Sequence, residues 1–447
     1  MKKIIIILFI LPFLNLFAQD KVPLSDAELA QNEALMRSLA KDIFDLNGVP
    51  FVQPMVEAVN SISNDGFYNT AYIDNKKDAF SIKFSVHTMY GSVPSSKQWY
   101  RPQLPNEQFA DSSLFQFSRF DFDFQTQTGS FDITDTAGLY YYLFKTLLND
   151  GIVSGEILPP EKSATLLGSS KSTFNFRDGL LGELARRRID SINQLGTPFG
   201  FQPISDSLAN QIASTLNGLP STIALPEGGS INQIFAAVPQ IDIGLPYGFE
   251  LNLRYIPEIN YGKNIGDFGF WGFGLRHNIS QWWNEENSQE KFQVALQFAM
   301  QGTNLSNVME ITSTRFEASA IMTNFNLHFS QRINNLFDVF GGLSYESINI
   351  INNYTYFLSH QIQVELYGNI PEDGYMKTSK AFTQEEIDRK ANKDDKPQTA
   401  EITLTAEQIK YTLGLYKQFG DFDFYAAYSI SQFNILNFGL SYKFDLK

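Results

Sequence analysis

Cysteine is absent from this 447-residue sequence, and basic residues are outnumbered by acidic ones. Without cysteine the chain can form no disulfide and use no thiol chemistry. The 34 Lys and Arg residues against 48 Asp and Glu residues give a net charge of -14. Nucleic-acid binding requires a positively charged surface, so we expect no nucleic-acid partner.

Motifs for catalysis and metal binding are lacking as well. No histidine has a second His or Cys at metal-ligand spacing. The histidines are His87, His277, His328 and His360. No G-x-S-x-G nucleophile motif occurs. We therefore predict a protein that is not an enzyme and holds no metal or cofactor, although a site assembled from distant strands would leave no such motif.

Long apolar runs are missing after the N-terminus. The first residues read MKKIIIILFILPFLNLFA, with Lys2 and Lys3 before an apolar run that is shorter than the roughly 20 residues of a membrane helix. This pattern predicts a signal peptide over residues 1–18. No Cys follows the expected cut, which excludes a lipid anchor, so the exported chain is either soluble or held in the outer membrane by its own fold.

Aromatic residues are plentiful, at 14%, and many lie on alternate positions of extended segments. In the closing segment NILNFGLSYKF, apolar residues alternate with polar or small ones: Leu436, Phe438, Leu440, Tyr442 and Phe444 against Asn437, Gly439, Ser441 and Lys443. Such alternation is typical of a β-strand with one apolar face. Because it recurs along most of the chain behind a leader, we predict an all-β fold, a transmembrane antiparallel β-barrel of about 12 to 14 strands in the outer membrane.

Other segments do not alternate. Residues 19–65 are expected to form an N-terminal helical segment that plugs the barrel, sits at its periplasmic mouth, or is an ordered tail. The barrel would then occupy residues 66–447, with an inserted helical region at about 150–220 and a long extracellular loop at 368–401. The inserted region carries Arg186 to Arg188, for which a solvated helix face is favoured over lipid-headgroup or substrate binding.

Several polar residues are predicted to face the lumen. Arg254 and Arg276 lie on adjacent predicted strands with inward parity, so they could bind a carboxylate ligand or Glu250. We favour an internal salt-bridge network over a ligand site. His87 and His328 have the same inward parity and are expected to be polar lining. Trp271, Trp282 and Trp283 are predicted membrane-interface anchors.

Two sequence blocks resemble known outer-membrane proteins. The segment Asn437–Phe444 resembles the C-terminal targeting signal of such barrels, in which Gly439, Tyr442 and Phe444 match, although three residues follow; this implies recognition by the barrel-assembly machinery. Residues 66–71, GFYNTA, and the run from 220 to 283 resemble an uncharacterised family of Bacteroidota outer-membrane barrels. The matching positions are Pro226, Gly228, Pro239, Gln240, Gly244, Pro246, Gly248, Arg254, Pro257, Gly272, Gly274, His277, Gln281 and Trp282, with Arg276 where Lys is commoner.

The family resemblance implies a barrel loosely similar to the long-chain fatty-acid transporters. The first functional hypothesis is therefore passive transport of small hydrophobic or amphipathic molecules. The second is a non-catalytic structural or accessory subunit of an outer-membrane assembly or secretion complex. Expected partners are outer-membrane lipids and lipopolysaccharide, the assembly machinery and other outer-membrane proteins. An open lumen would favour transport, whereas a lumen packed with paired polar residues would favour the subunit role.

Overall fold

The structure, a computed structural model, describes residues 26–73, 80–108, 116–123, 128–170, 172–196, 203–217, 222–225, 228–260, 267–283, 292–309, 314–333, 336–356 and 398–444. The predicted signal peptide, the residues after Phe444 and all but the last residues of the predicted loop at 368–401 lie outside these ranges. Among the described residues, no helix has the length and apolar character needed to cross a membrane.

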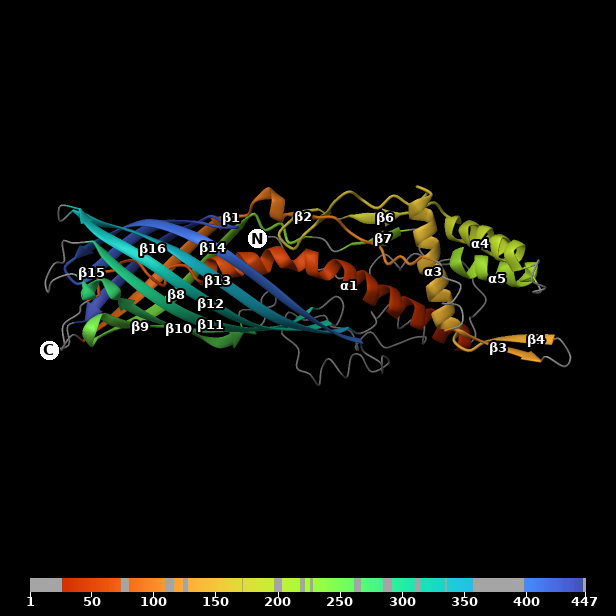
Figure 1. The fold of residues 1–447 in the computed structure, drawn as a ribbon, viewed down its shortest axis with the longest axis horizontal. Coiled ribbons are helices and arrows are strands. Elements are labelled where there is room, and N and C mark those ends of the chain that lie inside the picture. Colours follow the sequence, from red (N-terminus) through yellow and green to blue (C-terminus); the bar gives the residue numbers. More distant parts are fainter. Residues whose placement is uncertain are drawn as a thin grey trace.

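Ten strands form a closed barrel in which every neighbouring pair is antiparallel (Figure 1). The strands are β1 (Ser81–Ser92), β8 (Gln233–Leu245), β9 (Phe249–Asn260), β10 (Asp267–Asn278), β11 (Gln293–Met309), β12 (Thr314–Ile333), β13 (Phe337–Tyr356), β14 (Gln398–Phe419), β15 (Phe422–Ile430) and β16 (Ile435–Phe444). Consecutive strands from β8 to β16 pair in order, and β1 closes the ring between β16 and β8.

The predicted all-β barrel is confirmed, but its strand count was too high. The prediction of about 12 to 14 strands included weak candidates before residue 230. One of these, 139–148, lies within helix α3 (Thr136–Val153), and another, 115–124, overlaps β3 (Ser118–Asp123). Among the residues that the structure describes, β3 pairs with β4 (Thr128–Ile133) alone, in a hairpin outside the barrel. Periodicity alone does not distinguish a wall strand from such a hairpin.

The alternation in the sequence sets the two faces of the wall. In β9, Glu250, Asn252 and Arg254 are buried, whereas Leu253 and Tyr255 between and after them are exposed. The closing strand β16 behaves in the same way, with Leu436, Phe438, Leu440, Tyr442 and Phe444 all outward. Because the barrel is closed, the buried polar residues line its lumen and the exposed apolar residues form its outer surface.

The two faces exchange character partway along the longest strands, β12, β13 and β14, which have 20, 20 and 22 residues. Toward the end that carries the C-terminus, β14 presents Ile409, Leu413 and Leu415 outward. Further along the same face, Thr403, Thr405 and Glu407 are exposed instead. On the inner face, buried Leu404 and Ala406 replace the polar Gln408 and Lys410. The barrel therefore has a polar interior at one end and an apolar interior at the other.

An extension projects from the apolar end of the barrel, between β1 and β8 (Figure 1). It contains α3, α4 (Leu180–Gly196), α5 (Asp206–Asn217) and small two-stranded sheets formed by β2 (Trp99–Tyr100) with β5 (Ser163–Ala164), by β3 with β4, and by β6 (Thr173–Asn175) with β7 (Thr222–Ala224). Its core packs Phe144 and Leu148 of α3 against Leu181 and Leu184 of α4 and Leu216 of α5. Ile43 of α1 belongs to the same core, and Ala400 and Ile402 of β14 pack against it, so the core of the extension is continuous with α1 and the barrel wall.

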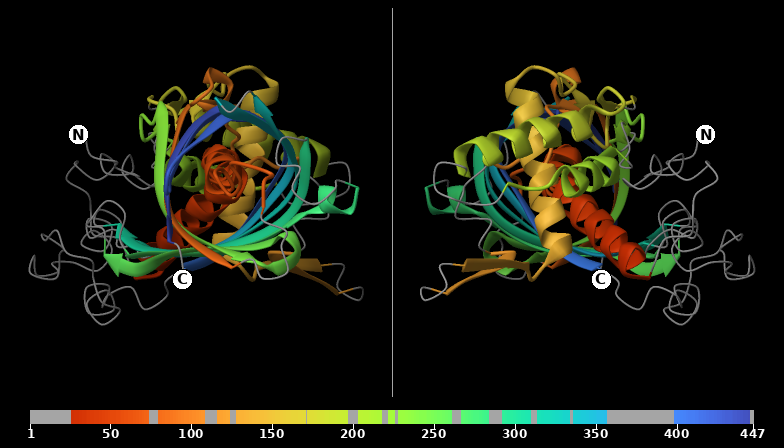
Figure 2. Two further views of the ribbon diagram at one scale, coloured as in Figure 1. Left: turned by 90° about the vertical axis from the view of Figure 1, so that its left-hand side faces the viewer. Right: turned by 90° about the vertical axis from the view of Figure 1, so that its right-hand side faces the viewer.

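Helix α1 (Asp26–Ser63) joins the extension to the barrel interior. Figure 2 shows the helix running into the ring of strands. Close to the middle of the helix, Asp42 accepts a hydrogen bond of 2.6 Å from the Tyr141 hydroxyl of α3. Toward its end, Val56, Ala58 and Ile62 are buried against the apolar inner face of the barrel. The helix therefore enters through the apolar end and stops inside.

Candidate functional site

The chain that follows α1 continues through the barrel lumen. We call residues 61–73, which include the last turn of α1, the lumenal segment. It contains the GFYNTA element of the sequence resemblance, at 66–71, and its buried members include Phe67, Thr70 and Ala71. The backbone amide of Ala71 donates a 2.7 Å hydrogen bond to the Ser330 hydroxyl of β12. Residues 66–73 were expected to begin the barrel, but the first wall strand is β1.

Gly66 lets the lumenal segment turn after the helix. Its φ of +72° lies in the left-handed region that favours glycine. A Cβ at this position would lie 2.8 Å from the Tyr425 hydroxyl and 3.1 Å from the His87 Cβ. The position therefore needs glycine both for its backbone conformation and for its close packing against two wall strands.

Arg254 holds the start of the lumenal segment against β9. Its guanidinium donates to the backbone carbonyls of Ser63 and Asp65, both at 2.8 Å, and to the Gln240 side chain at 2.7 Å. The guanidinium carbon also lies 3.7 Å from the centre of the Phe67 ring, a cation–π contact. Arg254 is 2% exposed, so its N–H groups form hydrogen bonds within the protein and not with bulk water.

Arg276 holds the other end of the lumenal segment. It donates a 2.8 Å hydrogen bond to the Thr70 carbonyl and forms a buried ion pair with Glu250. Glu250 also accepts from Asn252 at 2.9 Å. The structure therefore brings together the three residues selected from the sequence, Arg254, Arg276 and Glu250, in one internal polar network.

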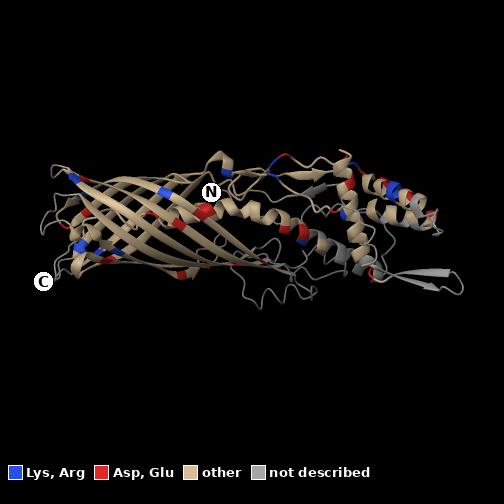
Figure 3. Cartoon of the chain, in the orientation of Figure 1, with Lys and Arg blue, Asp and Glu red and all other residues tan. Residues whose placement is uncertain are grey.

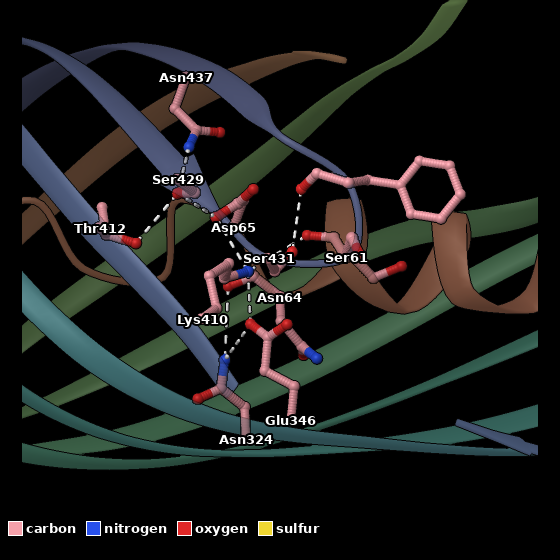
Figure 4. A network of polar contacts seen from close by, with 12 residues as sticks. Ser61, Asn64, Asp65, Asn324, Glu346, Lys410, Thr412, Ser429, Ser431 and Asn437 are labelled. Atoms are coloured by element: carbon pink, nitrogen blue, oxygen red, sulfur yellow. Dashed lines mark hydrogen bonds and ion pairs between the residues drawn. The ribbon is translucent and has the colours of Figure 1, made fainter. Parts of the chain in front are cut away.

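A third cation, Lys410 of β14, completes this network from the opposite wall (Figure 4). Its ammonium lies 3.0 Å from the Asp65 carboxylate, contacts Glu346 of β13, and donates to the Ser61 carbonyl at 3.2 Å. These residues were missed in the sequence. Their inward parity on predicted strands was the available signal for Lys410 and Glu346, but the position of Asp65 depends on α1 entering the lumen.

The two histidines predicted to face the lumen, His87 and His328, are both buried, and they make different contacts. His87 Nδ1 lies 2.7 Å from the Tyr425 hydroxyl, and its Nε2 lies 3.0 Å from the Ser85 hydroxyl. The His328 ring stacks on Tyr68 of the lumenal segment, with ring centres 4.4 Å apart. Both histidines therefore pack the filled lumen.

The remaining predicted residues lie on the outer surface or at the ends of the barrel. Trp271 is 40% exposed and covers Gly302 of the next strand, while Trp282 and Trp283 are exposed beyond the end of β10. Tyr442 and Phe444 face outward with ring centres 4.8 Å apart. Gly439 lies directly under the Tyr425 ring, which leaves no room for a side chain. Within the described ranges, no group of three or more His, Asp or Glu residues could hold a metal ion.

A family model covers the second part of the chain, residues 161–444. The chain belongs to a family of unknown function, DUF6588. This match includes nine of the ten barrel strands, β8 to β16, and leaves out α1, the lumenal segment and β1. The family description gives no activity.

Similarity to individual known proteins is weak. No curated protein matches the chain. Among solved structures, OccAB2 of Acinetobacter baumannii has 8% sequence identity, with 85% of this chain and 100% of that chain covered and a TM-score of 0.10. OccK1 (OpdK) of Pseudomonas aeruginosa also has 8% identity, with coverages of 83% and 100% and a TM-score of 0.10.

Proposed function

We propose that this protein is a non-catalytic outer-membrane barrel with a plugged lumen, which anchors the extension beyond the membrane as a structural or accessory subunit. The observation that carries the proposal is the binding of the lumenal segment by Arg254, Arg276 and Lys410.

The outer surface of the barrel supports placement in a lipid bilayer. Residues on several strands expose large apolar side chains, among them Leu413 (62%), Leu415 (51%), Phe424 (46%) and Phe438 (47%). Charged residues are sparse along the middle of the wall in Figure 3. Soluble proteins rarely expose so much contiguous apolar surface, and a closed barrel leaves no unpaired strand edge in the lipid. Outer-membrane lipids and lipopolysaccharide are the partners we propose for this surface.

The lengths of the connections support one orientation. At one end of the barrel the links are Pro246–Gly248, 279–292, 334–336 and Gly420–Asp421, of which only the link from 279 to 292 is longer than a tight turn. At the other end lies the extension, between β1 and β8. Outer-membrane barrels keep short turns in the periplasm and longer connections outside. We therefore propose that the extension and the start of α1 lie at the cell surface.

The filled lumen favours a structural role over passive transport. A channel needs an interior that solutes can traverse, whereas here a segment of the chain occupies the polar end and α1 occupies the apolar end. Passive transport of small amphipathic molecules, which the likeness to fatty-acid transporters suggests, would require this segment to move. We also propose that the barrel-assembly machinery recognises Tyr442 and Phe444. The protein is further proposed to be related to outer-membrane barrels of Bacteroidota and to have no enzyme activity.

Conductance in planar bilayers tests the plug. We expect the full-length protein to give no ion conductance, and a variant lacking residues 26–73 to conduct once its heat-modifiable electrophoretic mobility shows a folded barrel. Stable channels formed by the full-length protein, or uptake of amphipathic molecules into liposomes, would support transport instead. If the deletion variant does not fold, the conductance of the full-length protein alone distinguishes a plugged lumen from an open one.

Epitope tags on intact cells test the orientation. A tag at Gly155, a loop position with open space around it, should be bound by antibody without permeabilising the cells. A tag between Gly420 and Asp421 should be bound only after permeabilisation. The reverse pattern would place the extension in the periplasm.

A further inference from the structure

The structure assigns a covalent modification to the lumen: we propose that Lys410 and Asp65 condense to an isopeptide bond, with Glu346 transferring a proton. The three residues come from β14, the lumenal segment and β13. They are 1%, 3% and 0% exposed. No comparison or motif assigns a modification here, and the inference goes beyond the proposed anchoring role.

The contacts place the reacting groups side by side (Figure 4). The Lys410 Nζ lies 3.0 Å from the Asp65 Oδ1, an ion-pair contact that holds the amine next to the carboxyl group whose carbon it would attack. Both partners are fixed from other directions. The Asp65 carbonyl accepts from Arg254 at 2.8 Å, and Lys410 donates to the Ser61 carbonyl at 3.2 Å.

The two oxygens of Asp65 have different surroundings, which suits the two roles that a condensation needs. Oδ1 accepts a 3.0 Å hydrogen bond from the Ser429 hydroxyl, which would stabilise negative charge on that oxygen when the carbonyl carbon is attacked. Oδ2 is buried and has no hydrogen-bond partner in the described structure. It is therefore the oxygen placed to leave.

Glu346 is placed to move protons because it contacts Nζ directly. Its other oxygen, Oε2, is held by Gln408 at 2.7 Å, which fixes the carboxylate. The ammonium passes one proton directly to Asp65, which it contacts, so the amine becomes a nucleophile and the carboxyl group becomes neutral. Nζ then attacks Cγ, and Glu346 takes a second proton from the nitrogen. Both protons reach Oδ2 as the tetrahedral carbon turns toward these groups, the C–Oδ2 bond breaks and water leaves. The ammonium and carboxylate become an amide and one water, and Glu346 returns to its starting state.

Burial supplies the physical reason for condensation. One ammonium enclosed with two carboxylates leaves one carboxylate without a cation among these three residues, and removing each ion from water is unfavourable. Forming the amide removes an opposite-charge pair, and the single remaining carboxyl group can hold a proton. The product would also bind the lumenal segment covalently to the wall.

Mass spectrometry of the full-length protein purified from outer membranes tests the proposal. We expect the intact mass to be lower than the sequence mass by one water, and a digest to contain a branched peptide that joins Asp65 to Lys410. Lys410→Arg and Glu346→Gln should restore the full mass. The matched control Lys83→Arg, at a lumenal lysine 3.2 Å from Asp423, should keep the loss of water.

Two outcomes would overturn the proposal. One is a wild-type protein of full sequence mass. The other is a loss of water that persists in Lys410→Arg, because a succinimide at Asp65–Gly66 also releases water but does not use the lysine. The first outcome and the branched peptide are both read on the wild type, so the test holds even if a variant does not fold. If the bond is absent and the full-length protein gives no ion conductance in bilayers, this proposal fails while the proposed anchoring function is still supported.

Discussion

At the scale of single residues, the lumen is organised by cations that bind backbone carbonyls. Arg254, Arg276 and Lys410 each donate to a carbonyl of the lumenal segment and also contact a polar or acidic side chain. Carbonyls after a helix have no partners within the helix, so a buried chain must find donors elsewhere. The wall supplies those donors, which fixes the segment by its backbone.

Removing one partner of a lumenal ion pair should destabilise the barrel. Arg276→Met leaves Glu250 buried without its cation and the Thr70 carbonyl without a donor. Breaking a buried pair in this way typically costs about 3 to 5 kcal/mol. We expect the free energy of unfolding, measured by urea titration in lipid vesicles, to fall by that amount. Arg177→Met, which removes an exposed pair with Glu183, is the control and should have no measurable effect. Equal effects would contradict the assigned role.

In the extension, burial raises the pKa of Tyr100 to about 12, from an ordinary value of about 10. The folded protein therefore holds this proton more tightly than the unfolded chain does. The stabilisation is complete below about pH 10 and is lost between about pH 10 and 12, where only the unfolded chain ionises. Near-ultraviolet difference absorbance between wild type and Tyr100→Phe should show a midpoint near pH 12, moving to about pH 10 in denaturant. A midpoint near 10 in the native protein would show that the ring is accessible to water.

At the scale of elements, α1 forms where a local signal opposes it. Residues 19–65 were predicted to be helical, and α1 runs to Ser63 through Pro50 and Pro54. Proline removes a backbone donor and usually ends a helix. Here the later part of the helix is enclosed by the barrel, where Val56 and Ile62 pack against the wall. Tertiary packing outweighs the local preference to stop.

The turn that follows α1 should be sensitive to substitution. Gly66→Ala would place a Cβ 2.8 Å from the Tyr425 hydroxyl and also strain the backbone at φ +72°. Gly155→Ala, at φ +76° with nothing within 4 Å, has the same strain without the contact. Left-handed backbone costs an L-residue about 1 to 2 kcal/mol. We expect Gly155→Ala to lose about that much, Gly66→Ala to lose more, and thermal unfolding midpoints to fall in that order. Equal losses of stability in the two variants would show that the lumen accommodates the added methyl group at position 66.

The sequence predicted the wall well and the contents of the lumen only in part. Strand alternation depends on neighbours two residues apart, so the inward parity of Glu250, Arg254 and Arg276 could be read directly. The partners of these residues could not. Asp65 and Thr70 meet them only because α1 enters the barrel, a long-range contact with no local pattern. The extension was predicted in part, because the inserted helical region at about 150–220 contains α4 and α5. Its short strands were not recognised, since they pair within small sheets whose periodicity resembles that of wall strands.

At the scale of the whole molecule, the exchange of faces along β12, β13 and β14 divides the barrel into two environments. At one end, apolar residues face outward around a polar lumen, as expected for a wall in lipid. At the other end, polar residues face outward around apolar ones that enclose α1, as in a water-soluble protein. A transmembrane strand needs only about 9 to 11 residues, so the 22 residues of β14 exceed a bilayer. We infer that the bilayer boundary crosses β14 between Thr405 and Leu413.

This boundary can be located with one arginine placed at two positions on the same face of β14. Leu413→Arg puts a charge on the apolar belt, where arginine costs about 2 to 4 kcal/mol near the bilayer midplane. Thr405→Arg puts the same charge on the polar part of that face, where the cost should be close to zero. Free energies of unfolding in lipid vesicles should therefore differ by at least about 2 kcal/mol between the variants. Equal large costs would extend the lipid contact over the whole strand, and equal small costs would mean that the belt does not face lipid. Because the two side chains share one strand and one face, the difference reports only how deep each lies in the bilayer.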